Sequence, residues 1–592
     1  MSGFFGCVSK KDCVSNVFYG TDYHSHLGTK RAGLAFYNEN GFQRAIHSLE
    51  DGYFRTKFEN DLKGFEGTSG IGVISDAEAQ PVVVNSHLGK FAIVTVSKIA
   101  NAEELEREFL NQRKTFSETS QGSVNPTELV AKLIAEGEDF VSGIENVFDK
   151  IKGSCSILIL TAKGIIAARD KLGRTPIVIG KNCNGFAVAS ETSSFPNLNF
   201  TLESFLGPGE IVQVTAEGII SLRKPNKKMQ MCSFLWVYYG YPPSYYENVN
   251  AEEVRYNCGA ALAKNDNVEA DFVAGIPDSG IGHAIGYSNK RNIPYMRPYA
   301  KYTPTWPRSF MPQNQEMRDL VAKMKLIPNP AMIRNKRGIF LDDSIVRGTQ
   351  LKDNIRDLYD EGIKEVHMRI ACPPLIYPCE FLNFSRSKNT TDLASRATIL
   401  QLEGTENADF NKYSNPETEE YKAMVDRIRQ NLDLTTLRFQ RLTDLVAKMK
   451  LIPNPAMIKN KRGIFLDDSI VRGTQLKDNI RDLYNEGIKE IHMRIACPPL
   501  IYPCEFLNFS RSKNTTDLAS RATILQLEGT ENADLNKYSN PDTEEYKTMV
   551  DRIRQNLDLT TLKFQRLTDL VDAIGLPKEK LCTHCWDGSS FF

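Results

Sequence analysis

The stretch GIFLDDSIVRGTQ at residues 338–350 indicates the fold of this 592-residue chain. Its apolar start predicts a buried parallel strand, and that strand ends on two adjacent carboxylates, Asp342 and Asp343. A turn with Gly348 follows, and then a helix that ends at Gly362. The apolar face of the helix would carry Leu351, Ile355, Leu358 and Tyr359. A strand, a turn and a helix in this order direct backbone N–H groups and the positive helix end toward an anion.

The side chains of this loop suit a phosphorylated sugar and a divalent cation. Gly348 lets the backbone approach a bound group closely, and the hydroxyls of Ser344 and Thr349 can donate hydrogen bonds to a monophosphate. Asp342 and Asp343 suit a vicinal diol or a diol-bound Mg²⁺. The alternative is an ordinary buried strand with a charged turn, but such a strand seldom carries two acids before a hydroxyl-rich loop and a helix. The candidate substrate-binding residues are Asp342, Asp343, Ser344, Ile345, Val346, Arg347, Gly348 and Thr349.

The same string recurs at residues 463–475 as part of a tandem duplication. Residues 319–443 and 444–568 align without a gap at an offset of 125, and seven positions differ, including Arg334/Lys459, Asp360/Asn485 and Phe410/Leu535. The second copy repeats the candidate residues as Asp467, Asp468, Ser469, Arg472, Gly473 and Thr474. It lacks the upstream strands that we expect at residues 271–276 and 294–299, so it cannot complete the parallel sheet by itself.

Either copy could take the place beside those upstream strands. The first copy follows them directly, so a shorter loop closes when it does. We expect the copy that is left out to expose an apolar strand and helix face, and to be less ordered or to pack externally. A recent duplication or a sequence-assembly fault would account for the repeat, since two copies of this length do not make a solenoid.

The composition is that of a soluble globular protein with several domains. The formal net charge is zero and no apolar run is long enough to span a membrane, so we expect no nucleic-acid or membrane partner. Short β-like runs at residues 91–96, 155–160 and 164–168 suit a layered β/α domain, whereas strands alternate with helices from residue 271 onward. Twelve cysteines without a signal peptide favour a reducing, cytoplasmic location.

The loop resembles the signature of the type I phosphoribosyltransferases, and DDSIVRGT is closest to that of the amidophosphoribosyltransferase family. Further segments that resemble this family are ARDKLGRTP (168–176), ASET (189–192), PGEIV (208–212), IPDSG (276–280) and RSF (308–310). The resemblance implies an α/β protein of four parts. These are an N-terminal αββα glutaminase-type (N-terminal-nucleophile hydrolase) domain at residues 2–225, a type I phosphoribosyltransferase parallel α/β domain at 226–443, the duplicate at 444–568 and a tail at 569–592.

The family's activity is then expected of this chain. Phosphoribosyl pyrophosphate and an amine donor, glutamine or ammonia, would give phosphoribosylamine and pyrophosphate for purine synthesis. By resemblance, Ser309, Asp342 and Asp343 would hold Mg²⁺, and Lys325 lies in a basic loop that closes over pyrophosphate. Purine nucleotide feedback ligands and a homo-oligomer are also implied.

Four cysteines match the positions that hold a [4Fe–4S] cluster in the family's iron–sulfur members. They are Cys232, Cys379 (or its repeat Cys504), Cys582 and Cys585. The terminal CxxC alone would equally suit a zinc knuckle remnant or a redox pair. We expect Cys7, Cys13, Cys155, Cys183 and Cys258 to be ordinary core or surface thiols.

The glutamine-hydrolysing residues of the family are not matched. Ser2 stands in the position of the N-terminal cysteine nucleophile, and serine is the weaker nucleophile. The segment that carries the family's substrate-binding arginine reads GVISD (72–76), and the segment that supplies the oxyanion donors reads TVSK (95–98). Since losing one oxyanion donor costs on the order of 100- to 1000-fold in rate, we expect a nearly inactive glutaminase.

Three functions therefore remain open. The first is an amidophosphoribosyltransferase that uses ammonia, or residual glutamine chemistry at Ser2. The second is a non-catalytic paralogue that senses phosphoribosyl pyrophosphate or purine nucleotides, and the third is a phosphoribosyltransferase with another acceptor. The intact Asp342–Asp343 loop favours the first and the third, whereas the altered glutamine site favours the second and the third. We expect the first.

Overall fold

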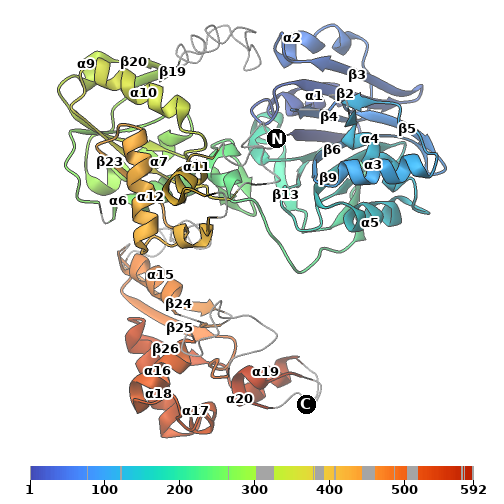
Figure 1. The fold of residues 1–592 in the computed structure, drawn as a ribbon. Helices are drawn as coiled ribbons and strands as arrows, with labels where there is room; N and C mark the ends of the chain where they lie inside the picture. Colours follow the sequence, from blue (N-terminus) through green and yellow to red (C-terminus); the bar gives the residue numbers. More distant parts are fainter. Residues whose placement is uncertain are drawn as a thin grey trace. The chain divides into compact units, whose positions relative to one another are not determined.

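A computed structural model of the chain forms two compact units, Met1–Leu445 and Val446–Phe592 (Figure 1). The structure describes residues 2–76, 78–120, 123–264, 266–301, 326–377, 379, 393–405, 408–442, 460–467, 469–471, 473–485, 487–502, 518–574, 578 and 581–589. No helix among these residues is long and apolar enough to cross a membrane.

The N-terminal part of the first unit has four layers in the order αββα. One antiparallel sheet has the order β13-β11-β12-β1-β4-β2-β3 and the other has the order β15-β14-β10-β9-β6-β5. Their strands are β1 (Gly3–Ser9), β2 (Arg31–Asn38), β3 (Gly41–Ser48), β4 (Ser69–Ser75), β5 (Val82–Ser86), β6 (Gly89–Ile99), β9 (Gly153–Thr161), β10 (Gly164–Ala168), β11 (Val178–Asn182), β12 (Gly185–Ala189), β13 (Thr201–Phe205), β14 (Ile211–Val214) and β15 (Ile219–Arg223). The three β-like runs expected from the sequence are β6, β9 and β10.

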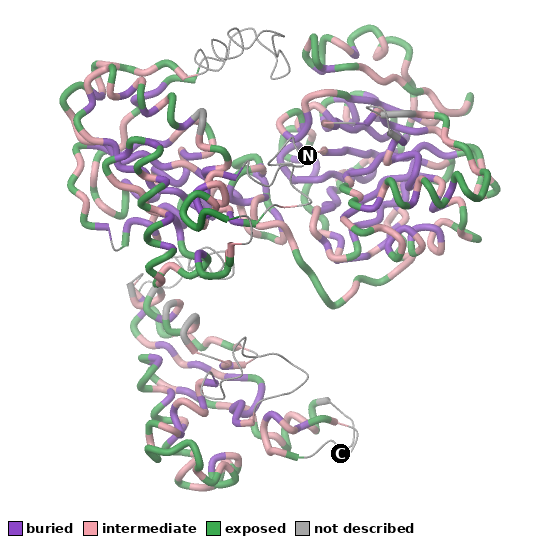
Figure 2. The backbone as a smooth tube through the Cα atoms, viewed as in Figure 1, coloured by how far each residue is buried: buried purple, intermediate pink, exposed green. Residues whose placement is uncertain are grey.

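Apolar residues of alternate strand positions fill the space between the two sheets, and the buried backbone there is purple in Figure 2. Helix α1 (Val14–Asp22) packs on the outer face of the seven-stranded sheet. Helices α3 (Ala102–Asn111), α4 (Pro126–Ile134) and α5 (Phe140–Lys150) cover the outer face of the other sheet. The predicted αββα domain is confirmed.

The rest of the first unit is built on a parallel sheet with the order β18-β21-β22-β23. Its strands are β18 (Phe272–Gly275), β21 (Arg337–Asp342), β22 (Glu365–Ile370) and β23 (Thr436–Phe439). Helix α7 (Gly280–Arg291) packs against β18 and β21, and α6 (Ala251–Ala263) packs on α7. The predicted loop lies between β21 and helix α10 (Thr349–Asp360), with Leu351, Ile355 and Leu358 buried as expected.

The strand expected at residues 294–299 is wrong in extent. Tyr295 makes a single parallel bridge to Val273, and a short strand β19 (Tyr299–Lys301) instead pairs with β20 (Leu326–Pro328). Pro298 explains the break, because a proline has no N–H to donate to a sheet ladder.

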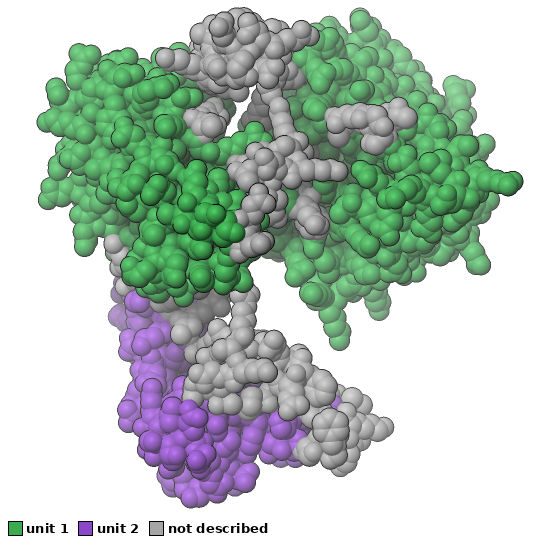
Figure 3. Space-filling model, in the orientation of Figure 1, with its two compact units in different colours: residues 1–445 green, residues 446–592 purple. Residues whose placement is uncertain are grey.

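The second copy forms the second unit, shown in purple in Figure 3, together with the C-terminal tail. Its strands β24 (Arg462–Asp467), β25 (Glu490–Ile495) and β26 (Thr561–Phe564) pair in the same parallel registers as β21, β22 and β23. The sheet has three strands, so β24 is an edge where β21 is paired with β18. Ile464 and Leu466 on this edge are 70% and 83% exposed. The expectation that the left-out copy exposes an apolar strand is confirmed.

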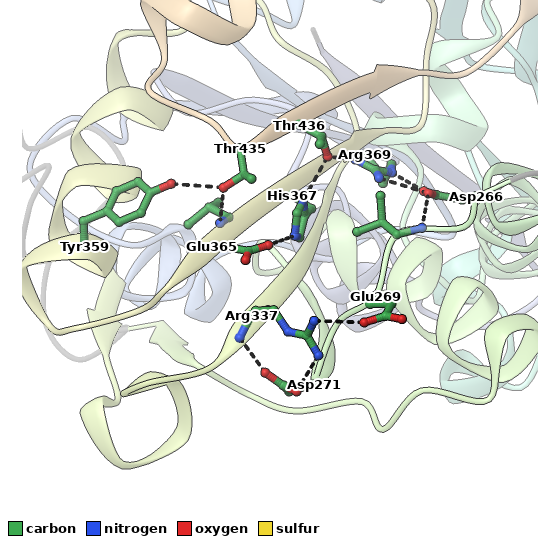
Figure 4. Close-up of polar contacts among 12 residues, drawn as sticks. Asp266, Glu269, Asp271, Arg337, Tyr359, Glu365, His367, Arg369, Thr435 and Thr436 are labelled. Carbon is green, nitrogen blue, oxygen red and sulfur yellow. Dashed lines mark hydrogen bonds and ion pairs between the residues drawn. The ribbon is translucent and has the colours of Figure 1, made fainter.

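Polar contacts fasten the first copy to the upstream segment (Figure 4). The guanidinium of Arg369, which is 2% exposed, donates to both carboxylate oxygens of Asp266. Arg337 donates from its backbone N–H to Asp271 at 2.7 Å, and its side chain reaches Glu269 at 3.2 Å. These contacts join residues that are far apart in sequence, and they attach the upstream segment that carries β18 to the first copy.

A buried histidine on α7 gives the first unit a predicted sensitivity to acid. Burial, reinforced by the Arg255 guanidinium, lowers the pKa of His283 to about 3. The folded protein therefore keeps His283 neutral, while the unfolded chain takes up a proton below its ordinary value of about 6.5. The unfolded state binds more protons in this range, so stability falls as the pH falls. We expect a loss of about 2 kcal/mol from this group between pH 8 and pH 5.

The measurement is the free energy of unfolding across this pH range for the wild type and for His283→Gln, which cannot titrate. The difference between the two proteins should shrink toward low pH by about the amount given above. Parallel pH profiles would contradict a neutral buried His283.

Candidate active site

The candidate site lies where β21 ends and α10 begins. Asp342 is the last residue of β21, and Thr349 is the first residue of α10. Gly348 between them has a φ of +78°, in the left-handed region that favours glycine. The turn therefore brings the backbone N–H groups at the start of α10 to the carboxyl end of the sheet, as the sequence predicts.

Three hydrogen bonds hold the two carboxylates. The Ser279 hydroxyl, at the start of α7, donates to Asp343 Oδ1 at 2.7 Å, and the Ser344 hydroxyl donates to Asp343 Oδ2 at 2.6 Å. The backbone N–H of Asp343 donates to Asp342 Oδ1 at 2.9 Å. Ser279 is a site residue that we did not assign from the sequence, although it lies in the IPDSG segment that follows the first strand.

Burial disfavours the negative charge of these two carboxylates, so a cation bound beside them would be stabilising. Burial raises the pKa of Asp342 well above the ordinary value, and the neighbouring Asp343 carboxylate raises it further. Burial also raises the pKa of Asp343, against the hydrogen bonds from Ser344 and Ser279. Among the described residues, no three His, Cys, Asp or Glu side chains gather to hold a metal ion. The half-buried Asp342 and the buried Asp343 fit Mg²⁺, which takes one or two protein carboxylates and completes its shell with water or substrate oxygens.

A cavity of about 230 Å³ opens at the carboxyl end of the neighbouring strand β18. It is lined by Gly275, Pro277, Asp278, Ile281, Tyr295, Arg297, Tyr299 and Lys301. Lys301 pairs with Asp278, the residue before Ser279. Two cations, Arg297 and Lys301, therefore line this cavity, and neither was assigned from the sequence because both lie outside the recognised segments.

The other predicted residues are distributed as follows. Ile345 is buried, Arg347 is exposed, and the Val346 carbonyl accepts from the Ala394 N–H at 2.7 Å. Ser309 and Lys325 lie outside the described residues, as do Asp468 and Arg472 of the second copy. Asp467, Ser469, Gly473 and Thr474 lie in the second unit, where Gly473 repeats the left-handed turn with a φ of +74°.

Comparison with known proteins decides the family. A model of the glutamine amidotransferase domain matches residues 69–197. The amidophosphoribosyltransferase of Methanocaldococcus jannaschii is 31% identical over 409 residues, which are 64% of this chain and 86% of the relative. That of Bacillus subtilis is also 31% identical, over 68% of this chain and 85% of its own. The chain belongs to the amidophosphoribosyltransferase family.

A solved structure agrees with this assignment. The glutamine phosphoribosylpyrophosphate amidotransferase from Bacillus subtilis, complexed with ADP and GMP, is 27% identical with a TM-score of 0.64. The match covers 76% of this chain and 93% of that one. Both halves of the predicted fold, a glutaminase-type domain and a phosphoribosyltransferase domain, are thereby confirmed, and the chain is an amidophosphoribosyltransferase-type glycosyltransferase.

The N-terminal end of this amidophosphoribosyltransferase-family chain lies against a buried polar cluster. Ser2 is half-buried, and its hydroxyl donates to the Ser75 hydroxyl at 3.4 Å. Nearby, His26 lies 3.1 Å from Glu191. Burial alone would raise the pKa of Glu191, but His26, His24 and the Tyr246 hydroxyl lower it to about 2.

The two segments expected to occupy the place of the family's glutamine site are part of the β-sandwich core. Residues 72–76 include the end of β4, which pairs with β1 directly beside Ser2, and they contain no arginine. Thr95 on β6 is buried and uses its polar groups internally: its N–H donates to Gln80 Oε1 at 2.7 Å, and its hydroxyl lies 2.8 Å from that of Thr127. Thr95 therefore uses these polar groups within the fold.

The four cysteines proposed for an iron–sulfur cluster are divided between the two units. Burial raises the pKa of the Cys232 thiol, and Cys379 is near enough to raise it further. Cys582 and Cys585 belong to the second unit, where the Ile501 and Tyr502 N–H groups donate to the Cys585 carbonyl at 2.9 and 3.0 Å. Cys504 lies outside the described residues. Neither unit by itself, as far as it is described, contains all four thiols of the predicted set.

Proposed function

We propose that the chain transfers nitrogen from free ammonia to phosphoribosyl pyrophosphate, and that its glutaminase domain is inactive. The observation that carries this proposal is the contrast between the phosphoribosyltransferase domain and the glutaminase-type domain. Asp343 is buried and held by the hydroxyls of Ser279 and Ser344, with the half-buried Asp342 beside it, at the start of the turn that leads into α10. At the other half, a serine and a segment without arginine stand where the family has its glutamine chemistry.

In this proposal each part of the site takes one part of the substrate. Asp342 and Asp343 accept from the ribose hydroxyls and hold Mg²⁺, which would supply positive charge to the departing pyrophosphate. The turn at residues 344–348 and the start of α10 bind the 5′-phosphate through backbone N–H groups. Arg297 and Lys301 lie in the adjoining cavity, where their charge suits the pyrophosphate group.

The proposed reaction is a displacement at the anomeric carbon. The lone pair of ammonia forms the new C–N bond as the C–O bond to pyrophosphate breaks, and the proton lost by nitrogen passes to water. Arg297 and Lys301 stabilise the negative charge that develops on pyrophosphate, which is the group on which the charge appears. Ammonia must be unprotonated to react, so the rate should rise with pH below the pKa of ammonium.

The same resemblance supports several coarser proposals. We propose the domain boundaries 2–225, 226–443, 444–568 and 569–592, a cytoplasmic homo-oligomer and a place in purine synthesis. Because the neighbouring Bacillus subtilis structure is a complex with ADP and GMP, we also propose purine nucleotides as feedback ligands of this chain. A [4Fe–4S] cluster on Cys232, Cys379 or Cys504, Cys582 and Cys585 remains a proposal.

The test is pyrophosphate release from Mg²⁺-phosphoribosyl pyrophosphate with ammonium chloride as the only nitrogen donor, at several pH values. We expect turnover that rises with pH and stops when Mg²⁺ is chelated. Binding of phosphoribosyl pyrophosphate without any release would instead support the non-catalytic sensing function. Release that is independent of ammonia but requires another acceptor would support the third function.

A further inference from the structure

The second copy presents an open sheet face whose counterpart in the first copy is fully covered. We define the open face by Ile464, Leu466, His492 and Arg494. The equivalent residues of the first copy, Ile339, Leu341, His367 and Arg369, are at most 3% exposed. In the second copy Ile464 and Leu466 are 70% and 83% exposed, and His492 and Arg494 are half-buried. The two faces have the same sequence, so the difference lies in what covers them.

The cover of the first copy is the segment from α6 to β19, residues 251–301. Helix α7 packs against β21, β18 pairs with β21 from Phe272↔Gly338 to Gly275↔Leu341, and Asp266 pairs with Arg369. The Ser279 hydroxyl and the Tyr299 hydroxyl add hydrogen bonds to Asp343 and to the Asn354 carbonyl. The chain contains this covering segment once and the strand that it covers twice.

None of the seven differences between the copies falls on a residue that makes these contacts. Arg337, Leu341, Asp343, Asn354 and Arg369 are repeated unchanged as Arg462, Leu466, Asp468, Asn479 and Arg494. The second copy can therefore make every one of the described contacts. Only the length of the loop differs, since 125 more residues must be closed when the second copy takes the place. That favours the first copy by on the order of tenfold.

We propose that the open face of the second copy is a docking surface for residues 251–301 of the same chain, in exchange with the first copy. The docked copy completes the four-stranded sheet and the other copy is left with an open face. The structure shows the arrangement with the first copy docked. The proposal goes beyond the proposed function and does not depend on it.

Exchange would also change which thiols lie near Cys232. In the structure Cys379 lies near enough to Cys232 to raise the pKa of the Cys232 thiol. Cys379 lies two residues after Tyr377. The backbone N–H of Tyr502, the repeat of Tyr377, donates to the Cys585 carbonyl in the second copy. Docking of the second copy would therefore bring the tail that carries Cys582 and Cys585 to the Cys232 end of the sheet. With the first copy docked, the tail stays with the second unit.

Two matched substitutions test the exchange, Leu341→Asp and Leu466→Asp. Leu341 is buried and Leu466 is 83% exposed, so a carboxylate is tolerated only in the copy that is not docked. The probe is Cys258 of α6, which is buried. It lies near enough to Cys372 of the docked copy to raise the pKa of the Cys372 thiol. Its alkylation by iodoacetamide is followed on the full chain by mass spectrometry, because the peptide that contains Cys258 is unique in the sequence.

We expect either single variant to protect Cys258 as the wild type does. The double variant, in which neither copy can dock, should react roughly a hundredfold faster, since a buried thiol reacts only when its surroundings open. A short bismaleimide should join Cys232 to Cys582 in Leu341→Asp, in which the docked copy carries the tail. Alkylation of Leu341→Asp at the rate of the double variant would overturn the proposal. If the protection of Cys258 falls when the protein is diluted, the proposal of docking within one chain is overturned. A segment from another molecule of the protein would then occupy the open face.

Discussion

Replacing Asp342 and Asp467 together by asparagine should reduce pyrophosphate release from Mg²⁺-phosphoribosyl pyrophosphate by at least about a thousandfold. The carboxylate of Asp342 is half-buried at the end of β21, beside the buried carboxylate of Asp343. Asparagine keeps the size of the side chain but removes the charge that attracts Mg²⁺. The measurement is pyrophosphate release at saturating ammonia, with magnesium varied.

The single variants distinguish the contributions of the two copies. With the first copy favoured by on the order of tenfold, Asp342→Asn should keep about a tenth of the activity and Asp467→Asn nearly all of it. A matched control is Asp353→Asn, which removes an exposed charge from the same helix that follows the loop. Full activity in the doubly substituted protein would show that the Asp-Asp turn is not the magnesium and ribose site.

Replacing Asp266 by alanine should destabilise the first unit by about 3–5 kcal/mol, the cost of leaving one partner of a buried ion pair alone. Asp266 is 6% exposed and accepts from Arg369 and, at 2.8 Å, from the Tyr287 hydroxyl. Burial would raise the pKa of Asp266, but Arg369 and Tyr287 lower it to about 2. Exchange of the copies cannot rescue this variant, because Asp266 lies in the segment that both copies would use.

The measurement is urea unfolding of the full chain, with the transition of the first unit followed by the exposure of Cys258. Asp353→Ala is the control, since its ion pair with Arg356 is about two-thirds exposed and should contribute at most about 1 kcal/mol. The pH dependence gives a second check. The pKa of Asp266 is lowered, so its contribution is present above pH 4 and is lost as the pH falls toward 2. An Asp266→Ala protein as stable as the control would refute this role of the pair.

The turn between β21 and α10 could be predicted because its determinants are adjacent in sequence. Apolar residues, two acids, Gly348 and an amphipathic helix specify the local structure without help from the rest of the chain. The exposed edge at Ile464 and Leu466 could be predicted as well, because counting strands showed that the second copy lacks a partner. The αββα domain followed from the family resemblance.

Contacts between distant residues could not be predicted in this way. Ser279 meets Asp343 across 64 residues and Asp266 meets Arg369 across 103 residues, and no periodic pattern encodes either pair. Arg297 and Lys301 became site residues only when the fold placed them at the end of β18. The strand expected at residues 294–299 was wrong because the break at Pro298 outweighed the apolar pattern around it.

The central claim is a working transferase beside a glutaminase domain that keeps its fold without its chemistry. The most direct measurement compares pyrophosphate release from Mg²⁺-phosphoribosyl pyrophosphate with glutamine and with ammonium chloride at raised pH, in the same preparation. The account predicts release with ammonia and at least about a hundredfold less with glutamine, the effect of losing a single oxyanion donor. Equal release with both donors would show that Ser2 and its surroundings hydrolyse glutamine, and would contradict the account.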